Sequence, residues 1–176
     1  KNLRELRPNW VYTTRADADL TNRQETFDLF SKYPGYKIVH LAALVGGLFF
    51  NQSNNSRMLR ENTLINLNVL EACKEYNIKS GVLVLSTCVY PDALASKSQE
   101  HPMREEQIHD GLPHSSNIGY AMAKRTLDFL PDALGLNGMI RLVPGNLYGP
   151  HDNFDLGQSH VIPALIRKMY FQGERC

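Results

Sequence analysis

The stretch that decides the fold is GVLVLS, residues 81–86, in which apolar side chains follow one another and a serine ends the run. A strand that is apolar on both faces is typical of a parallel sheet covered on both sides. Three further runs have strand-like composition: Val11–Thr14, Lys37–Leu44 and Met139–Pro144. The sequence therefore predicts a parallel sheet built from segments that are far apart in the chain.

Segments with apolar residues at helical spacing alternate with these runs. They are Thr21–Tyr33, Leu59–Tyr76, Tyr120–Leu130 and Val161–Phe171. Strands that alternate with helices predict an α/β fold with a doubly wound, Rossmann-like parallel sheet. We expect Thr21 to cap the first helix. We also expect Pro131 to shorten the third, because proline cannot donate a hydrogen bond within a helix.

The composition is that of an ordinary one-domain globular protein, with 176 residues, 43% of them hydrophobic and 21% charged. A net charge of +1 offers no electrostatic footprint for nucleic acid or an anionic membrane. The longest apolar stretch, Ile38–Phe50, is too short to span a bilayer. Three scattered cysteines indicate a reducing, cytoplasmic compartment, and the histidines show no metal-site spacing. We expect no nucleic-acid partner, no membrane partner and no metal.

The two ends of the sequence indicate an incomplete version of this fold. Residues 1–10 have the character of a helix end, and the sequence contains no glycine-rich turn of the kind that holds a cofactor pyrophosphate. We expect residues 1–150 to form a dinucleotide-binding domain that lacks its first strand and its glycine-rich loop. We expect residues 151–176 to begin a smaller substrate-binding region.

One pair of residues indicates acid–base chemistry. Tyr120 and Lys124 stand four residues apart, which places them one turn apart on the same helix face. An ammonium beside a phenol favours phenolate, and we expect Lys124 to lower the pKa of Tyr120. Ser86, at the carboxyl end of its strand, is placed to bind a carbonyl oxygen beside the tyrosine. The spacing alone is common by chance, and an exposed helix pair is its commoner meaning.

Two other residues are ambiguous when taken alone. A lone cysteine after a strand, such as Cys88, is most often a small buried hydrophobe. A lone histidine, such as His160, is most often a surface or capping residue. Each becomes a candidate acid or base only in the company of other matching residues.

Four longer strings contain these two residues together with other matching residues: HLAALVGG (40–47), LSTCVYPD (85–92), GYAMAKR (119–125) and GPHDNFDLGQSHVIPALIRK (149–168). In this order and spacing they resemble the GDP-L-fucose synthase family of the extended short-chain dehydrogenases/reductases, from about Tyr12 to Tyr170. The resemblance implies an enzyme that uses NADPH and releases NADP+. It implies conversion of GDP-4-keto-6-deoxy-D-mannose to GDP-L-fucose by epimerisation at C3 and C5 and then reduction at C4. It also implies a homodimer for the full-length protein.

The resemblance further implies roles for individual residues. The catalytic residues would be Ser86, Cys88, Tyr120, Lys124 and His160. The NADPH-binding residues would be Arg15, Asp19, Leu20, Ala42, Ala43, Val45, Lys124, Asn146, Leu147 and His160. The nucleotide sugar would be bound by Ser86 at its ketone and by Lys168 at its diphosphate.

Within these sets, the resemblance assigns separate tasks to individual residues. Cys88 and His160 would be the acid–base pair of the epimerisation, while Ser86 and Tyr120 hold the C4 oxygen. Lys124 would assist Tyr120 and bind the nicotinamide ribose. Arg15 would bind the 2′-phosphate of the adenosine, since a guanidinium fork matches a phosphate.

Two other hypotheses stay open. The chain could belong to another nucleotide-sugar epimerase or dehydratase, against which the pairing of Cys88 with His160 argues. It could instead be a non-catalytic family member, as the absent glycine-rich loop and Gly145, where the family usually has threonine, would favour. We expect the 176-residue chain to be inactive by itself, because the loop that holds the pyrophosphate is missing.

Overall fold

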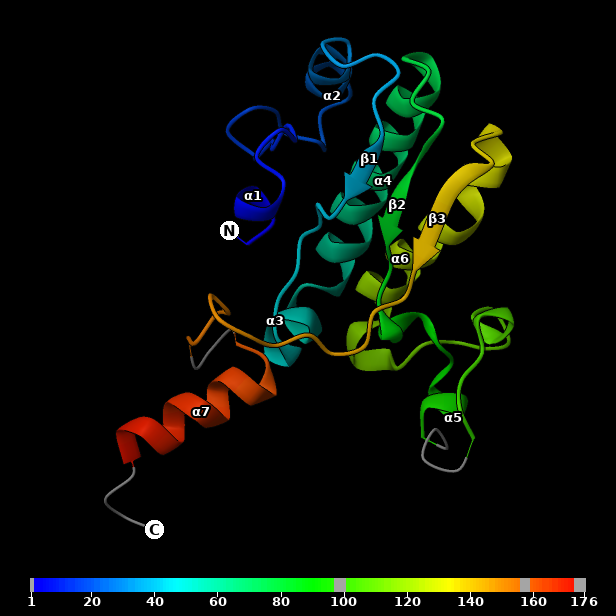
Figure 1. Ribbon diagram of the computed structural model, residues 1–176. Coiled ribbons are helices and arrows are strands. Elements are labelled where there is room, and N and C mark those ends of the chain that lie inside the picture. The colour runs from blue at the N-terminus through cyan, green and yellow to red at the C-terminus, as the bar shows by residue number, and fades with distance from the viewer. Residues whose placement is uncertain (1, 97–100, 156–158, 173–176) are drawn as a thin grey trace.

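The computed structural model describes residues 2–96, 101–155 and 159–172 of the chain. It contains a sheet of three parallel strands, β1 (Ile38–His40), β2 (Ser80–Val84) and β3 (Gly138–Leu142), in the order β1-β2-β3 (Figure 1). Val82 of β2 pairs with Val39 on one side and with Ile140 on the other. The predicted parallel sheet is confirmed, and each strand is shorter than the apolar run that it overlaps.

The strand predicted at Val11–Thr14 is wrong. These residues form an irregular segment between α1 (Asn2–Leu6) and α2 (Arg23–Phe30). A strand needs a neighbour whose backbone groups complete its hydrogen bonds, and β1 stands at the edge of the described sheet. Local β-branched composition therefore does not suffice to form a strand here.

Two long helices, α4 (Asn55–Glu75) and α6 (Ile118–Leu134), lie side by side on the same face of the sheet (Figure 1). Leu70 of α4, Leu83 of β2 and Leu127 of α6 are all 0% exposed and share one core. The remaining elements are short: α3 (Leu48–Ser53), η1 (Thr87–Val89), α5 (Asp92–Ala95), η2 (Glu105–Gln107), η3 (Ser115–Asn117) and α7 (Val161–Gln172). Within the described ranges, no helix is both long enough and apolar enough to cross a bilayer.

The predicted N-cap of α2 is wrong by one residue. Asn22, rather than Thr21, accepts the hydrogen bond from the N–H of Glu25 and so caps the helix. Thr21 is occupied elsewhere, because its N–H and its hydroxyl both donate to Asp19. The cap thus follows from a local hydrogen bond that helical spacing does not reveal.

The prediction that Pro131 shortens its helix is also wrong. α6 continues through Pro131 to Leu134 and ends at Gly135, whose φ of 74° is a conformation that glycine adopts without strain. Pro131 lies in the last turn and is fully buried, so its packing offsets the one hydrogen bond that its ring removes.

The two faces of the sheet differ in burial. His40, Leu83 and Arg141 are aligned across the strands and point toward the helices. His40 shares a hydrogen bond of 3.1 Å with Asn66 of α4, and Arg141 donates to the carbonyl of Asp128 in α6 at 2.8 Å. Burial lowers the pKa of His40 to about 4, which keeps its ring neutral. On the opposite face, Val39 and Ile140 are 41% and 64% exposed.

The two long helices begin at a point of close backbone approach. A side chain at Gly119 would place its Cβ 2.0 Å from the carbonyl oxygen of Asn55, so only glycine fits there. The N–H of Gly119 donates to the side-chain oxygen of Asn55 at 2.9 Å. Asn55 therefore caps α6 from the first turn of α4 and fixes where α6 starts.

Neighbouring residues of β3 provide a test of which face forms the core. Met139 is 4% exposed and faces the helices, whereas Ile140 is 64% exposed on the other face. Met139→Ala should lower the free energy of unfolding by about 2–5 kcal/mol, because it leaves a cavity. Ile140→Ala should cost less than about 1 kcal/mol. Urea unfolding of both variants of the 176-residue chain measures the difference, and equal losses would mean that the core lies elsewhere.

Candidate active site

The carboxyl end of β2 turns sharply and places two polar side chains together. The hydroxyl oxygen of Ser86 accepts a hydrogen bond of 3.3 Å from the N–H of Cys88 and so caps η1. Both side chains are partly exposed at this end of the sheet. The turn thus presents a hydroxyl and a thiol where open α/β sheets place their ligands.

Lys124 of α6 is buried at the same end of the sheet, with 3% of the residue exposed. Its Nζ donates a hydrogen bond of 2.7 Å to the carbonyl oxygen of Val84, the last residue of β2. Burial lowers the pKa of Lys124 to about 8, because the charged form loses its hydration. The structure therefore rules out the exposed helix pair as the explanation of the Tyr120–Lys124 spacing.

Tyr120 lies one turn before Lys124, with the lysine Nζ 5.9 Å from the centre of the phenol ring. The pKa of Tyr120 is raised to about 12, mainly by burial and also by the nearby Cys88, while a hydrogen bond with Ser86 opposes the rise. The predicted lowering of this pKa by Lys124 is therefore wrong. The lysine ammonium is bound to a backbone carbonyl rather than to the phenol oxygen, while the ring is largely desolvated.

Asn117, which the sequence analysis did not identify, also belongs to this cluster. Its Nδ2 donates a hydrogen bond of 3.1 Å to the Sγ of Cys88. The sequence feature that could have identified it is its position, three residues before Tyr120 at the start of the helix. Ser86, Cys88, Asn117, Tyr120 and Lys124 thus form one connected group.

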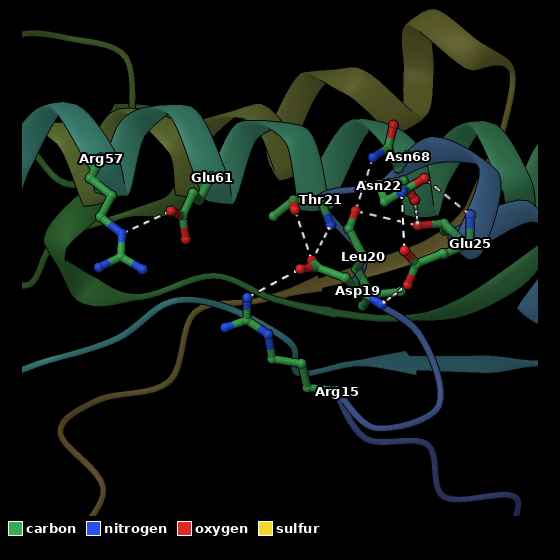
Figure 2. Close-up of polar contacts among 10 residues, drawn as sticks. Arg15, Asp19, Leu20, Thr21, Asn22, Glu25, Arg57, Glu61 and Asn68 are labelled. Carbon is green, nitrogen blue, oxygen red and sulfur yellow. Dashed lines mark hydrogen bonds and ion pairs between the residues drawn. The ribbon is translucent and has the colours of Figure 1, made fainter.

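The residues predicted to bind the adenosine lie in the segment between α1 and α2 (Figure 2). An Nη of Arg15 pairs with an Oδ of Asp19 at 3.1 Å, and these side chains are 76% and 36% exposed. The other Asp19 oxygen accepts from the N–H and the hydroxyl of Thr21 at 3.0 and 2.8 Å. These hydrogen bonds, and then the Arg15 ion pair, lower the pKa of Asp19 and keep it charged.

Helix α4 holds this segment and the loop after β1 in place. Asn68 donates from its Nδ2 to the carbonyl oxygen of Leu20 at 2.9 Å (Figure 2). Asn62 accepts from the N–H of Leu44 at 2.7 Å and donates to its carbonyl at 3.0 Å. These bonds fix the backbone around Ala42, Ala43 and Val45, which are partly or largely exposed.

The remaining predicted residues follow β3 in the chain, three of them in the segment before α7. Asn146 and Leu147 are exposed, and so are His160, just before α7, and Lys168 within it. Among the described residues, no hydrogen bond or ion pair joins His160 to Cys88. The segment 148–154 and α7 enclose a small, open hollow of about 220 Å³, lined by apolar side chains such as Tyr148, Phe154 and Ile162. In the parts of the chain that the structure describes, no three His, Cys, Asp or Glu side chains gather as a metal site would require.

Comparisons with known proteins give a consistent result. The family model described as "NAD dependent epimerase/dehydratase family" matches residues 1–174. GDP-L-fucose synthase of Dictyostelium discoideum is 44% identical over 164 residues, which are 92% of this chain and 50% of that protein. Probable GDP-L-fucose synthase of Drosophila melanogaster is 42% identical with the same coverage.

A solved structure extends the likeness to the fold. A GDP-L-fucose synthetase from Naegleria fowleri bound to NADP matches with a TM-score of 0.84 at 35% identity, over 98% of this chain and 54% of that one. The chain spans about half the length of the relatives that it matches. The expected Rossmann-like fold class is thereby confirmed.

The buried amine of Lys124 makes stability depend on pH in a defined direction. Its pKa is about 8 in the folded chain, against an ordinary 10.5, so between these values the unfolded chain binds a proton that the folded chain has released. Raising the pH from about 7.5 to about 9.5 should therefore add about 1–2 kcal/mol to the free energy of unfolding. This window ends below the ordinary tyrosine pKa of 10.0. Cys73, whose pKa burial raises from 9.0 to about 12, acts in the opposite direction near the upper pH and offsets part of the gain, equally in every variant compared.

Urea unfolding at the two pH values measures this gain. Lys124→Met should lose it, because no amine is left to titrate at this position. Lys74→Met, which removes an exposed lysine of α4, is the matched control and should keep it. The same gain in Lys124→Met as in the unaltered chain would show that another group is responsible.

Proposed function

The chain belongs to the NAD dependent epimerase/dehydratase family, and we propose that it carries the NADPH site and reaction centre of a GDP-L-fucose synthase. The reaction is the 3,5-epimerisation of GDP-4-keto-6-deoxy-D-mannose, followed by reduction of its 4-ketone. The observation that carries the proposal is the clustering of Ser86, Cys88 and Tyr120 at the carboxyl end of β2. Two relatives of that name, 44% and 42% identical, support it.

The epimerisation needs a base and a way to stabilise negative charge on oxygen. C3 and C5 are both next to the ketone, so removal of either proton leaves an enolate whose charge lies on the C4 oxygen. Cys88 removes the proton as a thiolate, and Ser86 and Tyr120 donate hydrogen bonds to the oxygen. His160 returns a proton from the opposite face of the sugar, a role that its ring chemistry allows near neutral pH.

The reduction places a proton on the same oxygen. Bound NADPH supplies the hydride that reduces C4. Tyr120 donates its hydroxyl proton to the C4 oxygen, and a pKa raised to about 12 keeps the phenol protonated, and so ready to donate, at neutral pH. Lys124 carries a charge at neutral pH and stabilises the phenolate that is left.

The residues present fit the two ends of NADPH. Arg15 already pairs with a carboxylate, and its exposed guanidinium is suited to a 2′-phosphate. Asp19 and Leu20 flank the adenine, while Ala42, Ala43 and Val45 line the channel toward the sheet. Lys124 holds the nicotinamide ribose. Asn146, Leu147 and His160 complete the nicotinamide end, and Lys168 binds the diphosphate of the nucleotide sugar.

The same proposal covers the organisation of the protein. Residues 1–150 form the NADPH-binding domain, and residues 151–176 begin the substrate-binding region. The full-length protein is a cytoplasmic homodimer whose partner is a nucleotide sugar, with no nucleic-acid or membrane partner.

Tyr120→Phe tests the proposed reduction. The substitution is made in a hybrid protein, in which this chain replaces the segment of the Dictyostelium GDP-L-fucose synthase that aligns with it. Single-turnover NADPH oxidation should slow by about 10²–10⁴-fold, because the proton donor is lost, while NADPH affinity is retained. Tyr36→Phe, at a 54% exposed tyrosine, is the matched control. If Tyr120→Phe oxidises NADPH at the rate of the hybrid without substitutions, Tyr120 is not the proton donor. If the hybrid without substitutions is folded but inactive, the proposed function is contradicted.

Arg15→Ala tests the proposed recognition of NADPH. A charge-assisted contact is worth about 1.5–3 kcal/mol, so the variant should lose roughly ten-fold or more in affinity for NADPH relative to NADH. Arg57, which pairs with Glu61 on α4, provides a control of the same residue type, and Arg57→Ala should leave the preference unchanged (Figure 2). Calorimetry with both cofactors on the hybrid measures the ratio. Equal losses for NADPH and NADH in Arg15→Ala would mean that Arg15 only supports the fold.

A further inference from the structure

Asn117 occupies the capping position of α6 but does not cap it. Asparagine at this position commonly accepts a hydrogen bond from the first free N–H groups of a helix. Here the side chain makes no such bond. The N–H of Gly119 donates instead to Asn55, which reaches it from the first turn of α4. The side chain of Asn117 is therefore not needed to start the helix.

That side chain is turned toward the thiol of Cys88. Its Nδ2 donates to the Sγ at 3.1 Å. Its Oδ1 is buried and, within the described ranges, has no hydrogen-bond partner. A group placed for stability would have both polar atoms satisfied, and a buried unsatisfied atom calls for a functional explanation.

We propose that Asn117 is a positioning residue for Cys88, whose amide N–H donates to the thiolate and holds it in place for proton abstraction. The inference rests on the proposed function, in which Cys88 is the base. A thiolate can accept a hydrogen bond but has no proton to donate, so the side-chain amide of Asn117 contacts it through an N–H donor. The N-terminus of the 17-residue helix α6 lies at the same point and favours negative charge.

The other groups near the sulfur of Cys88 make their contacts independently of Asn117. Tyr120, three residues further along α6, interacts electrostatically with Cys88. Lys124 follows one turn later, with its Nζ 5.9 Å from the centre of the Tyr120 ring. Ser86, from the turn after β2, holds the backbone N–H of Cys88 rather than its sulfur. Changing Asn117 therefore removes one hydrogen bond to the sulfur and leaves these groups as they are.

The rate of alkylation of Cys88 by iodoacetamide, followed by mass spectrometry across pH, reports the thiolate directly. The 176-residue chain is used with Cys176→Ser, so that Cys88 and Cys73 are the remaining thiols. Cys73 is 0% exposed, and burial raises its pKa to about 12, so its protection from alkylation reports that the chain is folded. Neither substrate nor cofactor is needed, so the outcome is independent of whether the proposed function is correct.

Asn117→Ala should raise the pH midpoint of Cys88 alkylation by about one unit, a roughly ten-fold loss of thiolate at a fixed lower pH. Asn117→Asp, which keeps the shape but replaces the donor with a negative charge, should raise it further. Ser116→Ala lies in the same turn, where its hydroxyl contacts His114, and should leave the midpoint unchanged. An unchanged midpoint in both Asn117 variants, with Cys73 still protected, would overturn the proposal. Loss of Cys73 protection in both would make Asn117 a structural brace and would also overturn it.

Discussion

Lys124 donates a hydrogen bond of 2.7 Å from its buried ammonium to the carbonyl oxygen of Val84. This bond ties α6 to the last residue of β2 and so helps to hold the helix that carries Tyr120 beside the turn that carries Ser86. A buried charge without a partner would be costly, and here the carbonyl satisfies one of its three donor positions.

The start of α6 is fixed by a second constraint, the contact between Asn55 and Gly119. Because Asn55 supplies the cap, α6 can begin close to the carboxyl end of the sheet, and the side chain of Asn117 is left to contact Cys88. One helix therefore brings three side chains to the turn after β2. Cys88, Tyr120 and Lys124 thus lie close to one another, as the two successive proton transfers that we propose would require.

Spacing and composition in the sequence sufficed to predict much of this arrangement. The apolar runs located all three strands, and the four-residue interval between Tyr120 and Lys124 placed both on one face of α6. What failed depended on partners distant in sequence. In the part of the chain that the structure describes, the run at 11–14 has no neighbouring strand, and the pKa of Tyr120 rises because packing desolvates its ring. The role that we propose for Asn117 depends on Asn55, which no local pattern connects to it.

Hydrogen exchange at the substrate tests most directly the central claim, that this cluster enolises a 4-ketosugar with Cys88 as the base. GDP-4-keto-6-deoxy-D-mannose is incubated in D2O with NADP+ and the hybrid protein, so that no reduction follows, and the C3 and C5 protons are followed by NMR. We expect both signals to disappear, and Cys88→Ala to slow their loss by about 100-fold or more. Equal exchange in the two proteins would contradict it, because the proton would then be removed by a group other than Cys88.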